Sequence, residues 1–266
     1  YNSVMTRGER VIANSEFTAA RIGIVHKIAP EKIDIVPRGC DPTRFDPMHI
    51  LDADIKKQRA AWRVEENEFV ILCPARLTRW KGQMVLLEAV AGLKGNFRLI
   101  LTGDTRDKTG EESRFAKELK ARAFETGLSE KLVFAGHVAN MPLAYAVADL
   151  AVLPSLDPEP FGRTAVEAQA ATLPVIVSDA GGFRETVKEE DALSDSSTNR
   201  TGWRVSPGDV DALTDKLQTV ANLSREELSA IGHTARQWVM ENFTTEKMCE
   251  QTLQIYQSVI RDYHGA

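Results

Sequence analysis

The sequence predicts an α/β fold with a doubly wound parallel sheet, and two observations carry this prediction. Short runs rich in β-branched residues alternate with longer helical patterns, which is the order of repeated βα units. Several short runs, such as "EFVILCPA" and "PVIVS", are apolar at consecutive rather than alternate positions. Such strands are typical of a sheet that helices cover on both faces.

The expected elements follow one another along most of the chain. We expect strands at 10–14, 32–37, 68–75, 97–103, 131–136, 149–154 and 174–178. Helical patterns occupy 83–93, 111–126, 140–148 and 162–172, and three closing helices follow residue 205. The polar segment 188–202 is expected to be a mobile loop.

Three parts are expected along the chain. Residues 35–245 form the doubly wound domain, and residues 246–266 form a final helix. Residues 1–34 contain a strand and a helix, and lead into "VPRGCDPTRFDP", a linker rich in proline. Because one strand and one helix cannot bury a core alone, we expect residues 1–34 to be the remnant of a preceding domain.

Composition argues against several classes of protein. The 266 residues are 43% hydrophobic and 27% charged, which is ordinary for a globular chain, and the net charge is -5. A negative net charge argues against a surface that binds nucleic acid. The three cysteines are far apart, which favours a reducing cytoplasm. No metal-binding spacing is found, and Asp52 and Asp54 are interpreted as the N-terminal cap of a helix.

Ligands of open parallel sheets bind at the carboxyl ends of the strands. The residues that follow each predicted strand are therefore the candidates for a binding site. Five loops are expected to converge on that edge. They contribute, in chain order, Arg76 with Lys81, Asp104, the segment around His137, the acid Glu159, and the Gly181-Gly182 turn.

Arg76 and Lys81 are two cations near the start of a helix. This arrangement suits a diphosphate, whose negative charge the two side chains would neutralise. The alternative is that both are ordinary surface charges. The Gly181-Gly182 stretch also has two interpretations. It could bind a phosphate or a hexose, or it could be a tight strand-to-helix turn.

The stretch "EPFGRTAVE" places two acids around a helix start. The helix is expected to begin at Phe161-Gly162, and the free amides of its first residues favour an anion. These are the amides of Phe161, Gly162, Arg163 and Thr164. Glu159 lies ahead of the helix and Glu167 in its second turn, so both could accept hydrogen bonds from hydroxyl pairs, each worth roughly 1.5–3 kcal/mol. The alternative is a pair of ordinary acids around a helix N-terminus.

Together these stretches resemble family 4 of the retaining glycosyltransferases, which have the GT-B fold. The resemblance covers nearly the whole chain in the right order, and E-x7-E is its most specific part. The motifs are "VIANSEFTA", "IDIVPRGCDPTRFDP", "PARLTRWKGQMVLLEAVAGL", "LILTGD", "VFAGHV", "AYAVADLAVLPS", "EPFGRTAVEAQA", "LPVIVSDAGGFRETV" and "TGWRVSPGD". In detail the chain is most similar to the alphaproteobacterial mannosyltransferases of the lipopolysaccharide core.

The resemblance implies a role for each charged residue of the site. Arg76 and Lys81 correspond to the pair that binds the donor's diphosphate and stabilises it as it leaves. Glu159 corresponds to the acid that holds hydroxyls of the transferred hexose, and Glu167 to the acid that holds the ribose. The amides of residues 161–164 correspond to a helix N-terminus that contacts sugar and phosphate.

Two further correspondences concern uncharged positions. Val138, with His137 and Met141, matches the loop beside the nucleobase, and Gly39 lies in the interdomain turn. The implied reaction transfers a hexose from a GDP-, UDP- or ADP-sugar to a glycan or glycolipid, with retention and without a metal or other cofactor. No protein nucleophile is implied, because the leaving diphosphate is thought to assist the acceptor hydroxyl.

Members of this family also have an N-terminal acceptor domain, of which only a last strand and helix are recognised here. The chain is therefore expected to be the donor-binding half, inactive alone, with its final helix crossing back to that domain. The full-length enzyme is expected in the cytoplasm, where it could associate peripherally with the membrane. Two alternatives remain open, a nucleotide-sugar-binding module without catalysis and a GT-B sugar-nucleotide epimerase.

Overall fold

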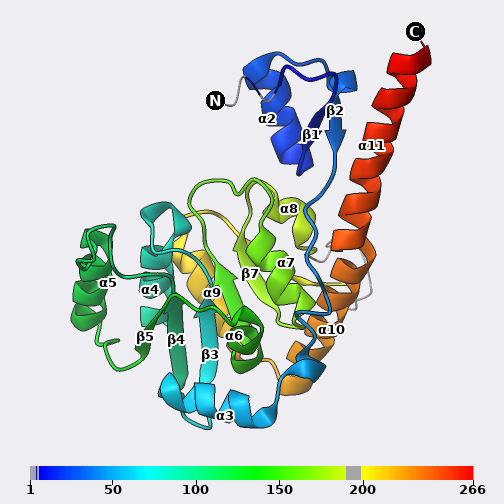
Figure 1. Cartoon of the computed structure of the whole chain (residues 1–266). Coiled ribbons are helices and arrows are strands. Elements are labelled where there is room, and N and C mark those ends of the chain that lie inside the picture. The colour runs from blue at the N-terminus through cyan, green and yellow to red at the C-terminus, as the bar shows by residue number, and fades with distance from the viewer. Residues whose placement is uncertain (1–3, 5, 190–198, 266) are drawn as a thin grey trace.

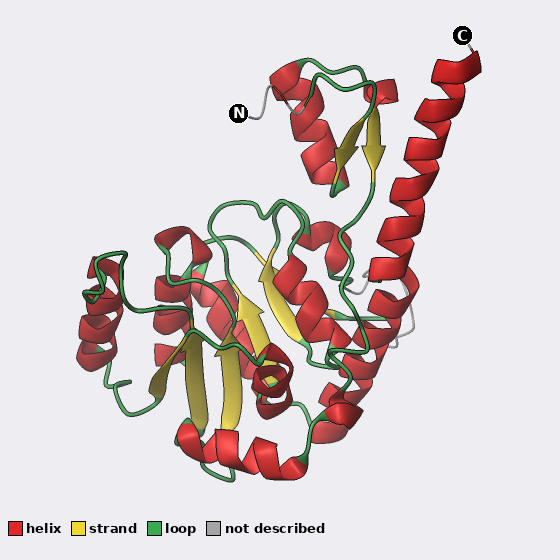
Figure 2. Ribbon diagram, viewed as in Figure 1, coloured by secondary structure: helices red, strands yellow, loops and turns green. Residues whose placement is uncertain are grey.

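The computed structural model describes residues 4, 6–189 and 199–265, and contains two separate sheets with helices around them (Figures 1 and 2). The larger sheet has the strand order β5-β4-β3-β6-β7-β8, and every pairing in it is parallel. Its strands are β3 (Phe69–Cys73), β4 (Phe97–Thr102), β5 (Leu132–Gly136), β6 (Leu150–Leu153), β7 (Val175–Ser178) and β8 (Gly202–Val205). This order is that of the Rossmann fold, so the predicted fold class is confirmed.

Helices connect the strands and follow the last of them. They are α3 (Asp52–Ala61), α4 (Gln83–Ala91), α5 (Arg114–Glu125), α6 (Met141–Val147), α7 (Arg163–Ala170), α8 (Phe183–Thr186), α9 (Val210–Ala221), α10 (Arg225–Asn242) and α11 (Thr245–Gly265). The helices predicted from periodicity are all present, with ends that shift by a few residues. The N-cap of α3 is Leu51, and not Asp52 or Asp54 as expected. The two aspartates lie in the first turn, where their negative charges interact favourably with the helix dipole.

The core consists of two apolar clusters, one on each face of the larger sheet. Along β3, Val70 and Leu72 belong to the cluster that includes side chains of α6 and α7. Ile71 and Cys73 belong to the opposite cluster, with side chains of α4, α5 and α9. Because successive strand residues point to opposite faces, a strand covered on both sides must be apolar throughout. The consecutive apolar runs therefore predicted correctly that helices cover both faces of the sheet.

One strand of the larger sheet was not predicted. β8 pairs with β7, and Trp203 within it is 1% exposed. Its four residues follow a polar segment and contain a glycine and an arginine, so the apolar pattern that indicated the other strands is weak there. The expected loop at 188–202 ends in this strand, and residues 190–198 of it lie outside the described part of the chain.

The smaller sheet contains β1 (Val11–Ala13) and β2 (Ile33–Ile35), which pair in parallel, with α2 (Glu16–His26) between them in sequence. The strand expected at 32–37 therefore belongs to the N-terminal unit and not to the larger sheet. Figure 1 shows α11 running from α10 toward this unit. Tyr256 of α11 and Val25 of α2 line the same cavity. None of the described helices is long and apolar enough to cross a membrane.

A buried ion pair lies beside the central strands. Arg98 in β4 donates from two guanidinium nitrogens to both carboxylate oxygens of Glu68, at 2.8 and 3.0 Å. The two side chains are 8% and 9% exposed. Arg98 also donates to the carbonyl of Glu130, which satisfies a further donor. Such a pair stabilises the fold only while both partners are present, because either charge alone would be buried without compensation.

We predict that Arg98→Leu lowers the free energy of unfolding by about 3–5 kcal/mol, because it leaves the Glu68 carboxylate buried and unpaired. Urea unfolding followed by circular dichroism measures this change. The matched control is Arg114→Leu, whose side chain is 91% exposed in its pair with Glu118, so a loss below about 1 kcal/mol is expected. Equal losses in the two variants would contradict the account of the buried pair.

Candidate functional site

The strand order reverses direction between β3 and β6, and the loops that follow these two strands meet there. The amide of Leu156 donates to the carbonyl of Trp80 at 2.7 Å. A Cβ atom on Gly82 would lie 1.8 Å from the carbonyl oxygen of Pro154, so this position accepts only glycine, which also adopts a φ of 73°. A crevice at the carboxyl ends of strands beside such a switch point is where open α/β sheets bind their ligands.

An ion pair between Lys81 and Glu159 spans the switch point. Lys81 lies in the short turn before α4, Glu159 in the loop after β6, and the side chains are 14% and 11% exposed. The hydroxyl of Ser155 donates to the same Glu159 oxygen at 2.8 Å. Because both charges are largely shielded from water, each depends on the other for compensation. The two residues were predicted to bind different parts of one ligand, and in the structure they contact each other.

The Gly181-Gly182 turn supports the backbone of Glu159. The amide of Gly182 donates to the carbonyl of Glu159 at 2.8 Å, and Gly181 forms an isolated bridge with the same residue. A Cβ atom on Gly181 would lie 2.4 Å from that carbonyl oxygen. Neither glycine lines the pocket described below, so the structure shows a tight turn that packs against the site.

Helix α7 begins at the predicted position. Gly162 is its N-cap with a φ of 90°, and a Cβ atom there would lie 2.5 Å from the Phe183 ring. Phe161 is buried edge-on against Phe243, with the ring centroids 5.6 Å apart. Among the described residues, no hydrogen bond is donated by the backbone amides from Phe161 to Thr164. This helix N-terminus therefore offers an anion its free amides and its positive dipole end.

Glu167 lies in the second turn of α7, as predicted. Its carboxylate accepts a hydrogen bond from Arg163 at 2.8 Å and a longer one from the Tyr145 hydroxyl at 3.5 Å. Burial, and next the charge of Glu167, raises the pKa of the Cys40 thiol to about 12. The same two causes raise the pKa of Tyr145. Both neighbours therefore stay protonated at neutral pH, and the hydroxyl of Tyr145 remains a donor to the carboxylate.

One pocket of about 610 Å³ brings the two acids of the E-x7-E stretch together. Several of the predicted site residues line it, namely Gly39, Glu159, Phe161, Gly162, Arg163 and Glu167. Gly39 reaches the pocket because Cys40, next to it, exchanges backbone hydrogen bonds with Phe243 and Thr245 at the start of α11. The proline-rich linker is thereby fixed against the helix pair α10 and α11.

The other predicted site residues do not line this pocket. Arg76 is exposed after β3, its carbonyl accepts a hydrogen bond from Gln83 at 2.7 Å, and no ion pair of its guanidinium occurs in the described structure. Asp104 is exposed, and its carboxylate accepts from the amide of Arg106 at 2.9 Å, which shapes its own turn. Lys81 and Thr164 are partly buried at the starts of α4 and α7.

The loop expected beside the nucleobase follows the edge strand β5. His137 is exposed there, whereas Val138 and Met141 are half-buried and pack against the apolar cluster of the α7 face. Their side chains thus contribute to the core, and the structure does not bring them into the pocket.

Among the residues beside the site that were not predicted are Ser155, Tyr145, Cys40 and Gln83. Ser155 binds Glu159, and its position directly after a strand was a usable signal. Tyr145 and Cys40 lie beside Glu167, and Gln83 holds the carbonyl of Arg76 with a fully buried side chain. These three come from an apolar helix, a linker and a helix start, so their contacts depend on tertiary packing that no local pattern encodes.

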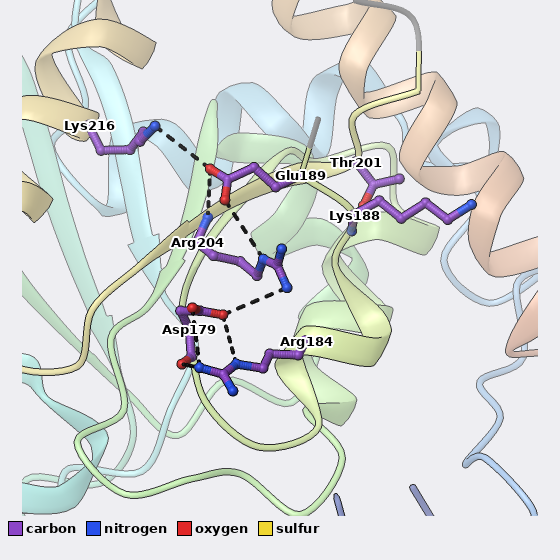
Figure 3. A network of polar contacts seen from close by, with 7 residues as sticks. All are labelled: Asp179, Arg184, Lys188, Glu189, Thr201, Arg204 and Lys216. Carbon is purple, nitrogen blue, oxygen red and sulfur yellow. Dashed lines mark hydrogen bonds and ion pairs between the residues drawn. The ribbon is translucent and has the colours of Figure 1, made fainter. Parts of the chain in front are cut away.

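A charge network lies beyond the site at the ends of β7 and β8 (Figure 3). Asp179 pairs with Arg184 at 2.9 Å and with Arg204 at 3.7 Å. Glu189 in turn lies 3.8 Å from both Arg204 and Lys216. Each cation of this network has a carboxylate beside it, in contrast to Arg76, so the network serves to join β7, β8, α8 and α9.

Known glycosyltransferases are similar to most of this chain. The family model of "Glycosyl transferases group 1" matches residues 54–238, which is more than half of the chain. The chain is 26% identical over 261 residues to the lipopolysaccharide core biosynthesis mannosyltransferase LpsB of Rhizobium meliloti, covering 97% of the chain and 68% of that protein.

Two solved structures are similar over nearly the whole chain. A glycosyltransferase from Rickettsia africae has a TM-score of 0.87 and 30% identity, over 98% of the chain and 66% of that structure. Anabaena Alr3699/HepE in complex with UDP-glucose has a TM-score of 0.84 and 28% identity, over 96% of the chain and 65% of that structure. The chain thus spans about two thirds of the length of these proteins, and it belongs to the group 1 family of glycosyl transferases.

Proposed function

We propose that this chain binds the nucleotide-sugar donor of a glycosyltransferase that moves a hexose with retention of configuration. The observation that carries the proposal is the Lys81–Glu159 ion pair at the switch point, next to a helix N-terminus with free amides. A cation, an acid and an anion-binding helix end are the groups needed for a diphosphate linked to a sugar. The related HepE structure contains UDP-glucose, which supports a donor of this class.

The diphosphate would bind between Arg76, Lys81 and the amides at the start of α7. Arg76 is exposed and has no carboxylate partner in the described structure, so its charge is available to a ligand. Lys81 is paired with Glu159 and would exchange this partner for a phosphate oxygen. The positive charge of Lys81 would stay compensated during that exchange, which avoids the cost of an unpaired buried charge.

The exchange would leave Glu159 to the hexose. Its carboxylate would lose the Lys81 ammonium and keep the Ser155 hydroxyl, so it could accept hydrogen bonds from two sugar hydroxyls. Glu167, lower on α7 and lining the same pocket, would hold the ribose hydroxyls. Its carboxylate is already oriented by Arg163 and Tyr145, which lowers the entropy lost on binding.

Retention is proposed from the family resemblance. In the complex the Ser155 hydroxyl and the sugar hydroxyls would donate to Glu159, so this carboxylate would act as a hydrogen-bond acceptor and not as a nucleophile. The residues of the chain would thus contribute position and charge. Arg76, Lys81 and the α7 amides would stabilise the negative charge that develops on the leaving diphosphate, a contribution that grows in a site shielded from water.

The acceptor and the site of action form part of the same proposal. The relative LpsB acts in lipopolysaccharide core biosynthesis, which supports a cell-envelope glycan or glycolipid as acceptor and mannose as the hexose. We propose that residues 35–245 are the donor-binding domain, that another domain binds the acceptor, and that the chain alone transfers no sugar. A cytoplasmic location with peripheral contact to the membrane stays a prediction from the sequence.

We predict that the chain binds at least one of UDP, GDP and ADP, and that Glu167→Ala weakens this binding about tenfold because the ribose loses a charged acceptor. Isothermal titration calorimetry with the three nucleotides measures both effects. The matched control is Glu125→Ala, which removes an exposed acid of α5. If none of the nucleotides binds, or if Glu167→Ala binds as tightly as the unchanged chain, the site is wrong.

We also predict that Arg76→Ala weakens the binding of nucleoside diphosphate by about tenfold or more but barely changes the binding of the nucleoside. The physical reason is that the guanidinium would contact only the phosphates. Calorimetry with both ligands gives the ratio, and Arg106→Ala, an exposed arginine in the next loop, is the control. Equal losses for the two ligands would remove Arg76 from the phosphate site.

A further inference from the structure

The N-terminus of α2 is bound by a residue of α8 that lies far from it in sequence. The carboxylate of Glu185 accepts hydrogen bonds from the amides of Glu16 and Phe17, at 2.8 and 2.9 Å. Each of its two oxygens accepts one bond, and these first-turn amides have no partner within the helix. The negative charge also faces the positive end of the helix dipole. Glu185 therefore holds the N-terminal unit against the domain of the larger sheet.

The same turn of α2 also binds the residue that follows Glu159. The hydroxyls of Ser15 and Thr18 both donate to the carbonyl of Pro160, the latter at 3.0 Å. Ser15 is fully buried, and its oxygen accepts the amide of Thr18 at 3.0 Å as the N-cap of α2. The backbone beside Glu159 is thus fixed by side chains of the N-terminal unit.

The loop that contains Glu159 is held from two directions as a result. On one side the amide of Gly182 binds the Glu159 carbonyl, and on the other side α2 binds the Pro160 carbonyl. The segment 181–185 takes part in both, because it contains the glycine turn and the carboxylate that holds α2. Loss of the Glu185 carboxylate would free α2 and with it the contacts to Pro160.

We propose that Glu185 is a positioning residue for Glu159, acting through the N-terminus of α2. This inference rests on the proposed function, in which Glu159 holds the hexose of the donor. Glu185 would contact neither sugar nor phosphate, because both of its carboxylate oxygens already accept backbone amides of α2. It sets the position of the loop from which Glu159 reaches the hexose, so its effect falls on the sugar part of the ligand and spares the nucleotide part.

The test compares nucleotide-sugar with nucleoside diphosphate in the variant Glu185→Gln. Glutamine keeps the shape but turns an NH₂ group toward a backbone amide, so one hydrogen bond and the charge are lost. We expect affinity for the nucleotide-sugar to fall about tenfold and affinity for the diphosphate to change less than about twofold. Ser15→Ala, which removes a hydroxyl that holds Pro160, is expected to act in the same direction.

The matched control is Arg184→Gln on the same helix. Arg184 is an exposed neighbour that pairs with Asp179 and makes none of the contacts to α2 (Figure 3). Both affinities should stay within about twofold of those of the unchanged chain, since such exposed pairs contribute little. Equal losses for both ligands in Glu185→Gln, or no loss for the nucleotide-sugar, would overturn the proposal.

Hydrogen exchange of the unliganded chain tests the positioning itself, whether or not a nucleotide binds. In Glu185→Gln, faster exchange is expected both in residues 15–18 and at Gly182, whose amide binds the Glu159 carbonyl. Faster exchange confined to residues 15–18 would show that Glu185 holds α2 without positioning the Glu159 loop. If no nucleotide binds the unchanged chain while exchange rises at both places, the proposed function fails and the positioning contact stands.

Discussion

The ion pair between Lys81 and Glu159 is the interaction on which the arrangement of the site depends. It joins the loops after β3 and β6, the two strands at which the sheet reverses its order. Both side chains are largely buried, so water cannot replace the partner of either one. Each charge therefore depends on the opposite charge beside it for compensation. A ligand that separates them must therefore supply an anion for Lys81 and hydrogen-bond donors for Glu159, as a diphosphate bound to a sugar does.

The rest of the fold brings this pair together and keeps its loops close. Parallel strands with both faces covered place the loop ends at one edge, and Gly82 lets the first loop pass within contact of Pro154. The amide of Gly182, in the glycine turn before α8, binds the carbonyl of Glu159. On the other side, α2 of the N-terminal unit binds the carbonyl of Pro160. Several elements that are distant in sequence thus fix one carboxylate, which is the kind of preorganisation that binding sites require.

The sequence predicted the layers and the helix starts well because those follow from local periodicity. Apolar residues at consecutive positions required a doubly covered sheet, and the spacing of the E-x7-E stretch placed Glu167 in the second turn of α7. β8 was missed because a glycine and an arginine interrupt the apolar pattern of its four residues. The contacts of Lys81 with Glu159, and of Glu185 with α2, join residues 78 and about 169 positions apart, and only the folded chain reveals them.

The most direct test is a crystal structure of the chain with a nucleotide-sugar bound. We predict the distal phosphate at the carboxyl ends of β3 and β6, with an oxygen in hydrogen-bonding contact with Lys81 and with amides at the start of α7. The Lys81–Glu159 contact should be open in that complex. A nucleotide bound elsewhere while the ion pair remains intact would contradict the central claim.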